Sequence, residues 1–101
     1  MARFDLFRVN SRRIPLVVDV QAEILGDLAS RVVIPLRLVE QAEEPPLPRL
    51  KPVLVIGGRS YLLLTTDIGA QPVHSLGEPV GNIEQHRDEI TSAMDFFFQG
   101  F

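Results

Sequence analysis

Apolar and polar positions follow a strand-like pattern through most of the chain. They begin to alternate within residues 3–7, which is typical of a β-strand. Residues 14–21 and 31–39 are rich in β-branched apolar side chains, and we predict a strand in each. Pro35 interrupts the second of these stretches. We therefore expect it at a sheet edge, a bulge or a bend rather than in a central ladder.

The middle of the chain contains the clearest hairpin signal. In residues 53–66, two apolar runs flank the pair Gly57–Gly58, so we predict a β-hairpin with a tight turn. Before it, residues 40–52 hold four prolines and three glutamates. We therefore predict that this segment crosses the surface of the protein, with room for a short edge strand. After it, residues 71–76 predict a further short strand and residues 77–82 a connector.

The period then changes to that of a helix. Residues 83–94 contain neither glycine nor proline, and their early acidic residues suit a helix N-terminus. Asn82 is a candidate N-cap, and Gly100 would lie just past the helix end. With strands first and one helix last, we predict a single domain over residues 1–101. Its fold class is α+β, a mostly antiparallel curled sheet with one C-terminal helix.

The last eight residues, MDFFFQGF, hold four of the six phenylalanines. At 3.6 residues per turn, one face of the helix carries Ile90, Ala93, Met94 and Phe97, and we expect this face to pack on the sheet. Phe96 instead falls among polar positions, and Phe98 falls on the flank. Two interpretations of these two residues remain open. Either the sheet wraps the helix more widely, or the aromatic rings form a surface for a partner.

Composition and charge narrow the class of protein. The chain is 46% hydrophobic and 23% charged, which is typical of a globular domain. It has no cysteine, no apolar run long enough for a membrane helix, and no apolar core of a signal peptide near its start. The net charge of −3 divides into +1 for residues 1–51 and −4 for residues 52–101. The acidic second half indicates a protein partner rather than general nucleic-acid binding.

No pattern typical of catalysis or of metal binding appears in the sequence. Asp19 alternates with valines, so we expect it to face solvent. Asp67 follows two threonines at a strand end and is explained by a turn. The two carboxylates would form a catalytic pair only if the fold brought them together. One basic group is left, which would contact phosphates or an acidic protein segment: Arg8, Arg12 and Arg13.

Several short pieces, in this order and spacing, resemble the CcdB family of bacterial toxins. They span the whole chain and include a penultimate glycine, and the others are VDVQ (18–21), VIPL (33–36), TTD (65–67), PV (72–73) and GE followed by V (77–80). The resemblance implies a sheet of SH3-like barrel character with a C-terminal helix. It also implies a homodimer that is not an enzyme and has no cofactor and no metal.

The resemblance also implies a target and an inhibitor. CcdB proteins poison DNA gyrase by binding its A subunit, which traps gyrase in a cleaved complex with DNA. A CcdA antitoxin binds the dimer through a disordered C-terminal segment, releases gyrase and lets the complex repress its own operon. We therefore expect the gyrase A subunit, a CcdA-like antitoxin and a second copy of the chain as partners. DNA would be contacted only through the antitoxin complex, and the location would be the bacterial cytoplasm.

The expected binding residues follow by position. We assign the antitoxin contact to Arg8, Arg12 and Arg13. The gyrase-binding residues carried over from the family are Ile24, Leu25, Asp95, Phe98, Gln99, Gly100 and Phe101. The best-known family member has tryptophan before the penultimate glycine and isoleucine at the end, where this chain has Gln99 and Phe101. Glutamine lacks the large aromatic face of a strong anchor, so we expect Phe98 or Phe101 to take that role.

Two alternatives remain open at this stage. Endoribonuclease toxins of the MazF and Kid type share the fold, and an RNA-cleaving chain would need a basic groove with acid–base groups. The candidates for that chemistry are Arg8, Arg12, Arg13, Asp19 and Asp67. The other alternative is a CcdB homologue that keeps its antitoxin and operator functions but no longer poisons gyrase.

Overall fold

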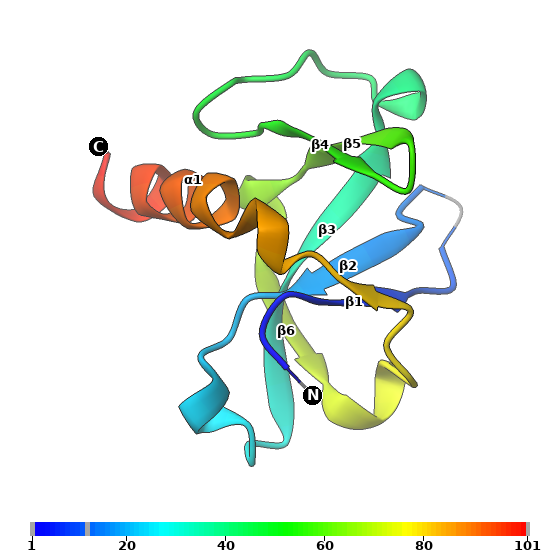
Figure 1. Ribbon diagram of the computed structural model, residues 1–101, viewed down its shortest axis with the longest axis vertical. Coiled ribbons are helices and arrows are strands. Elements are labelled where there is room, and N and C mark those ends of the chain that lie inside the picture. Colours follow the sequence, from blue (N-terminus) through cyan, green and yellow to red (C-terminus); the bar gives the residue numbers. More distant parts are fainter. Residues whose placement is uncertain (1, 12, 101) are drawn as a thin grey trace.

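One curled, wholly antiparallel sheet and a C-terminal helix make up the fold of the computed structural model, which describes residues 2–11 and 13–100 (Figure 1). This arrangement confirms the predicted α+β class. The strands are β1 (Asp5–Arg8), β2 (Leu16–Asp19), β3 (Ser30–Leu38), β4 (Val53–Ile56), β5 (Arg59–Leu63), β6 (Gly69–Pro72) and β7 (Gly81–Asn82). The helix is α1 (Arg87–Gln99). Short 3-10 turns lie at Glu23–Leu25 (η1), Val39–Gln41 (η2), Thr65–Asp67 (η3), Val73–Ser75 (η4) and Glu84–His86 (η5).

The long strand β3 organises the sheet. One of its edges pairs with β2, and the strand order continues through β1 to β7. Its other edge pairs first with β6, over Ser30–Val33, and then with β5, over Leu36–Leu38. Because β5 and β6 share this edge end to end, they diverge from it in different directions, and the sheet curls around β3 (Figure 1).

Pro35 lies in the middle of this central strand, opposite Val17 of β2, so the prediction of an edge, bulge or bend is wrong. Its carbonyl accepts a hydrogen bond from the N–H of Leu64 (2.9 Å), on the side of β5 and β6. Within a strand, the N–H and C=O of one residue point the same way. The missing N–H of Pro35 therefore faces the place where β3 changes partner, and no bond of a strand ladder is lost there.

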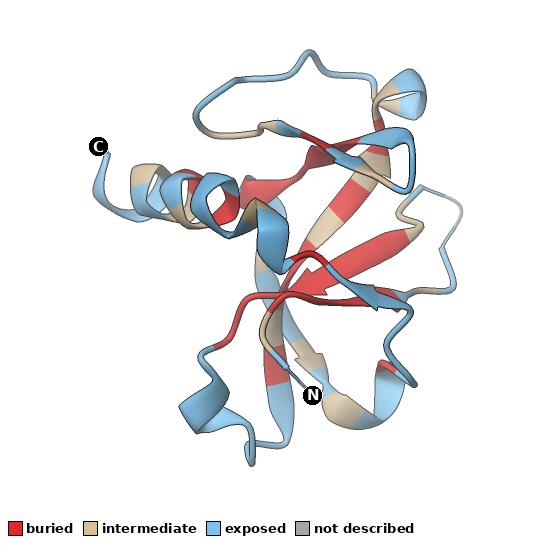
Figure 2. Ribbon diagram, viewed as in Figure 1, coloured by how far each residue is buried: buried red, intermediate tan, exposed pale blue. Residues whose placement is uncertain are grey.

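Alternation along β1, β2 and β3 buries side chains on both faces of the sheet. The larger core joins one face to the helix through Ile83, Ile90 and Ala93. The smaller core lies on the other face, where Leu76 packs on Phe7, Val17 and Val33. These three strands thus form the buried centre of the molecule (Figure 2).

Asp19 is fully buried on the second face, so the expectation that it faces solvent is wrong. Its Oδ2 accepts a hydrogen bond from Nε of Arg31 (2.7 Å), and both side chains are inaccessible to solvent. Asp19 pairs in register with Val33. Arg31 lies two residues before Val33 in β3 and therefore on the same face of the sheet. A buried carboxylate is stable only with such a partner.

The predicted hairpin is confirmed. Gly57 and Gly58 join β4 to β5 with φ of +59° and +80°. A two-residue turn of this kind needs positive φ at both positions, which matches the right-handed twist of the strands. Residues 40–52 follow the surface as predicted, with one short bridge between Leu47 and Lys51.

Two predicted boundaries are shifted. In place of a strand over residues 71–76, β6 ends at Pro72 and η4 follows. The helix begins at Arg87, directly after η5, and its N-cap position is His86, so the prediction of Asn82 as N-cap is wrong. Oδ1 of Asn82 instead accepts a hydrogen bond from the N–H of Glu84 (2.9 Å), one residue before the N-cap position of η5. Gly100 ends α1 as predicted, with φ of +79° and its N–H bonded to the Phe96 carbonyl (2.8 Å).

Candidate functional site: the free end of the C-terminal helix

The C-terminal end of α1 extends beyond the sheet (Figures 1 and 2). Ile90 and Ala93 are fully buried, and Met94 packs partly against the same core. Phe97 was predicted to continue this packing face, but its side chain is 39% exposed. The helical period is correct, and the prediction is wrong because the sheet ends before the helix does.

Phe98 is the most exposed aromatic side chain of this helix, at 66%. Its ring lies 5.0 Å from that of Phe97, centroid to centroid, with the planes tilted by 51°. Such a tilted pair is a favourable aromatic arrangement. The free end of α1 therefore presents two adjoining rings, which belong to the kind of apolar patch that marks interaction sites.

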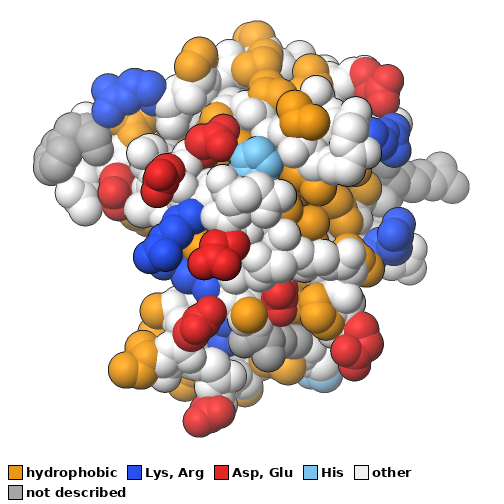
Figure 3. All heavy atoms as spheres, viewed as in Figure 1, with side chains coloured by type: hydrophobic (Ala, Val, Ile, Leu, Met, Phe, Trp, Pro, Cys, Tyr) orange, Lys and Arg blue, Asp and Glu red, His pale blue; other side chains and the backbone are white. Residues whose placement is uncertain are grey.

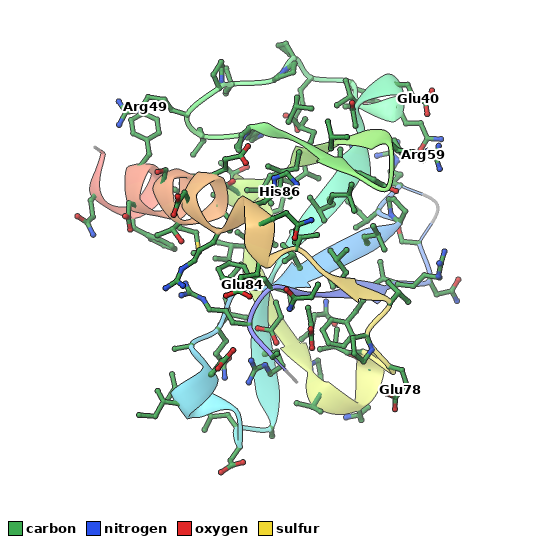
Figure 4. All side chains as sticks on the ribbon, in the orientation of Figure 1. Glu40, Arg49, Arg59, Glu78, Glu84 and His86 are labelled. Atoms are coloured by element: carbon green, nitrogen blue, oxygen red, sulfur yellow. The ribbon has the colours of Figure 1, made fainter. Side chains whose placement is uncertain are left out.

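Phe96 was predicted to lie among solvated positions, yet it is half-buried. The guanidinium of Arg49 lies 4.2 Å from the centre of its ring, in a cation–π contact (Figure 4). Arg49 belongs to the proline-rich segment 40–52, which the sequence placed on the surface. This segment therefore contacts α1 at Phe96, on the side of the helix that faces away from the sheet.

A groove of about 480 Å³ separates the same segment from the helix. Asp95 borders this groove, and Phe98 and Gln99 follow one turn farther along the same side of α1. Its lining residues are Pro48, Arg49, Pro52, Asp88, Glu89, Ser92 and Asp95.

His86 fixes the start of the helix. Its Nδ1 lies 2.9 Å from Oε1 of Glu89 and its Nε2 lies 3.0 Å from the Val55 carbonyl of β4 (Figure 4).

The structure describes only part of the C-terminal end of the predicted gyrase-binding surface. Gln99 and Gly100 are exposed, and Phe101 lies outside the described residues. The left-handed conformation of Gly100 ends the helix at Gln99.

A second exposed apolar group lies in the connection between β2 and β3, residues 22–29. Ile24 is 92% exposed, and Leu25 and Leu28 are about half exposed. Figure 3 shows apolar side chains gathered at the lower left, over the segment that contains η1. Ile24 and Leu25 were predicted as site residues, whereas Leu28, which is exposed beside them, was not.

The basic residues lie elsewhere. Arg8 and Arg13 are exposed and flank the β1–β2 connection at the right of Figure 1, and the free end of α1 lies at the left. The carbonyl of Arg13 accepts from Nε of Arg37 (3.1 Å), and its guanidinium lies 4.0 Å from Glu43. Arg12 falls outside the described residues. The predicted antitoxin and gyrase residues therefore occupy different sides of the molecule.

The two carboxylates considered for catalysis have separate environments, since Asp19 is buried against Arg31 and Asp67 is exposed in η3. Over residues 2–11 and 13–100, no group of three or more histidine, aspartate or glutamate side chains is placed to hold a metal ion. Within the same part of the chain, no helix is long and apolar enough to cross a membrane.

A comparison with known families assigns the chain to one of them. A family model described as CcdB protein matches residues 3–100, essentially the whole chain. The chain belongs to the CcdB family. Membership of the CcdB family implies the toxin of a toxin–antitoxin system, with an antitoxin as its partner.

Proposed function

We propose that this CcdB family member binds the A subunit of DNA gyrase and traps the gyrase–DNA cleavage complex, without catalysing a reaction itself. The observation that carries the proposal is the exposed aromatic end of α1, where Phe98 is 66% exposed beyond the edge of the sheet. The binding surface we assign consists of Ile24, Leu25, Asp95, Phe98, Gln99, Gly100 and Phe101.

The chemistry of these residues suits a protein partner. Aromatic side chains carry a large share of binding energy at interfaces, because they bury much area with few rotatable bonds. Gln99 supplies amide hydrogen bonds but no aromatic face. Phe98 adjoins it and is free to enter a pocket of the partner, so we assign the anchor role to Phe98.

A CcdA-like antitoxin would neutralise the toxin through a different surface. We assign its contact to Arg8, Arg12 and Arg13, whose guanidinium groups form paired hydrogen bonds with carboxylates of an acidic segment. A homodimer in the bacterial cytoplasm completes the proposal, with DNA contacted only through the antitoxin complex.

An RNA-cleaving mechanism is less consistent with the described residues. Asp19 is fully buried in an ion pair with Arg31, so it is not accessible to a nucleotide. Without it, Asp67 is the one carboxylate left beside Arg8, Arg12 and Arg13 in the set considered from the sequence.

The proposal is tested by regulated expression in a sensitive bacterial strain and in a strain with an altered gyrase A subunit. We expect growth arrest in the first strain and growth in the second. Rapid loss of mRNA with unaffected gyrase would instead indicate a ribonuclease.

Removal of residues 99–101 tests the surface. These residues follow the last buried side chain of α1, so we expect the truncated chain to fold and dimerise but to lose growth arrest. Circular dichroism and sedimentation serve as the controls. Continued killing by a folded, truncated chain would contradict the mechanism.

If the full chain is not toxic, Gln99→Trp tests whether the missing aromatic group at position 99 is the cause. Restored toxicity would mean that the missing aromatic group is the only defect.

A further inference from the structure

The connection between β2 and β3, residues 22–29, holds apolar side chains out in solvent. Ile24 is almost fully exposed, and Leu25 and Leu28 are about half exposed. Apolar side chains of a free loop lower their free energy by folding back onto the protein. A loop that keeps them outward therefore needs a constraint from the residues beneath it.

Gln21 supplies one such constraint. It is a buried residue whose Nε2 donates to the Leu25 carbonyl in the loop (2.8 Å). Its Oε1 accepts from the N–H of Val32 in β3 (3.0 Å), and its own N–H donates to Oδ1 of Asp19 (2.9 Å). The side chain thus connects the loop to β3, and the backbone N–H of the same residue connects it to Asp19 of β2.

Arg31 lies beneath the same loop. Its Nε is bonded to Asp19, while Nη1 and Nη2 are buried and have no hydrogen-bond partner among the described residues. A Cβ at Gly26 would lie 3.7 Å from Nη1 of Arg31 and only 3.1 Å from the Glu23 carbonyl. Gly26 has an ordinary φ of −63°, so close packing, rather than backbone conformation, favours glycine there. The turn of the loop therefore closes directly over the guanidinium.

Stability alone explains this arrangement poorly. Apolar side chains of similar volume often replace a buried ion pair without loss of stability, and buried N–H groups without a partner are unfavourable. A polar network of fixed geometry does, however, specify one conformation among several.

We propose that Gln21 and Arg31 are positioning residues, which hold the loop 22–29 in the conformation that presents Ile24 and Leu25 to gyrase. The inference rests on the proposed function for the identity of the partner. A loop ordered in advance loses less conformational entropy when it binds, so the network raises the affinity without contacting the partner.

Hydrogen–deuterium exchange of the free protein tests the positioning role. Gln21→Met keeps the length of the side chain and removes both of its hydrogen bonds. We expect amide exchange in residues 22–29 to become at least tenfold faster, with no change in the β4–β5 hairpin. The matched control is Gln71→Met, because Gln71 lies on the neighbouring β6 and its side chain forms a hydrogen bond only with Ser75 among the described residues. Unchanged exchange of the loop in Gln21→Met would overturn the proposal.

A double-mutant cycle tests whether the effect acts through the loop. If the binding form of the loop becomes a tenth as populated, affinity for the gyrase A subunit falls about tenfold. In a background with Ile24→Ala and Leu25→Ala, we expect Gln21→Met to lower affinity less than twofold further. A fully additive tenfold effect there would overturn the positioning role, because a general structural defect acts independently of these contacts.

Gly26→Val is a second variant. It changes an exposed residue and leaves the buried pair of Asp19 and Arg31 intact. It should displace the turn from Arg31. As in Gln21→Met, we expect faster amide exchange in residues 22–29 and lower affinity for the gyrase A subunit. Failure of the unmodified chain to bind gyrase would overturn the proposed function, whereas the exchange experiment still decides whether Gln21 and Arg31 hold the loop.

Discussion

At the scale of single residues, neighbours on the same helix have very different environments. Phe96 is covered by Arg49, Phe97 is partly exposed, and Phe98 is mostly free. These differences arise from what lies opposite each side chain, because all three have the same chemistry. Phe98 is consequently the residue whose removal should affect binding most and folding least.

Phe98→Ala is expected to lower affinity for the gyrase A subunit about 30-fold, which corresponds to roughly 2 kcal/mol for an aromatic anchor. The free energy of unfolding should change by less than about 0.5 kcal/mol, because the side chain is largely exposed. Surface plasmon resonance and urea denaturation measure the two quantities. Val80→Ala, at an exposed apolar position before β7, is the control and should change neither. Full affinity of Phe98→Ala would refute the anchor role.

At the scale of elements, turns and caps follow local sequence. The Gly57–Gly58 turn and the Gly100 cap both appear where the sequence predicts them, because each depends on a positive φ that glycine adopts without strain. The strand β3 behaves differently. Pro35 predicts a sheet edge, a bulge or a bend, but it lies in the central strand. The sheet accommodates it there because β5 and β6 share one side of β3, and the missing N–H of Pro35 faces the gap between them.

Gly58→Ala tests the turn. No atom lies within 4 Å of the added Cβ, so its effect comes from the backbone conformation alone. We expect a loss of about 1–2 kcal/mol in the free energy of unfolding. Gly69→Ala is the matched control, because Gly69 does not have positive φ and its Cβ would make an ordinary contact at 3.9 Å. It should be neutral or slightly stabilising. Equal losses in the two variants would contradict this account.

At the scale of the whole molecule, the predicted partner surfaces are separate. The free end of α1 and the basic β1–β2 connection lie at opposite sides of Figure 1. A change to one surface should therefore leave the other functional.

Arg13→Glu is expected to lower affinity for the cognate antitoxin about tenfold at low salt and less at high salt, since exposed charges are screened. Gyrase poisoning in the absence of antitoxin should be unchanged. Arg59→Glu makes the same change of net charge on the β4–β5 hairpin, at a residue outside the assigned contact, and serves as the control. A loss of gyrase poisoning in Arg13→Glu would contradict the separation of the two surfaces.

Much of the fold and part of the site could be predicted from the sequence. The hairpin, the helix with its C-terminal glycine and the order of strands are local properties, which depend on periodicity and on glycine. Ile24, Leu25, Phe98 and Gln99, which were carried over from the CcdB family, are all exposed, and their role in binding stays a prediction. The pairing of Asp19 with Arg31 required the register of β2 and β3, which no local pattern encodes.

By itself, the sequence therefore determined the elements, the fold class and the family. Only the tertiary structure decided which apolar side chains are core and which are surface. Phe97 lies on the packing face of its helix but extends past the sheet, whereas Phe96 lies on the polar face but is covered by Arg49. Burial depends on residues distant in the chain and on where an element ends. For this reason, helical periodicity alone could not distinguish the two.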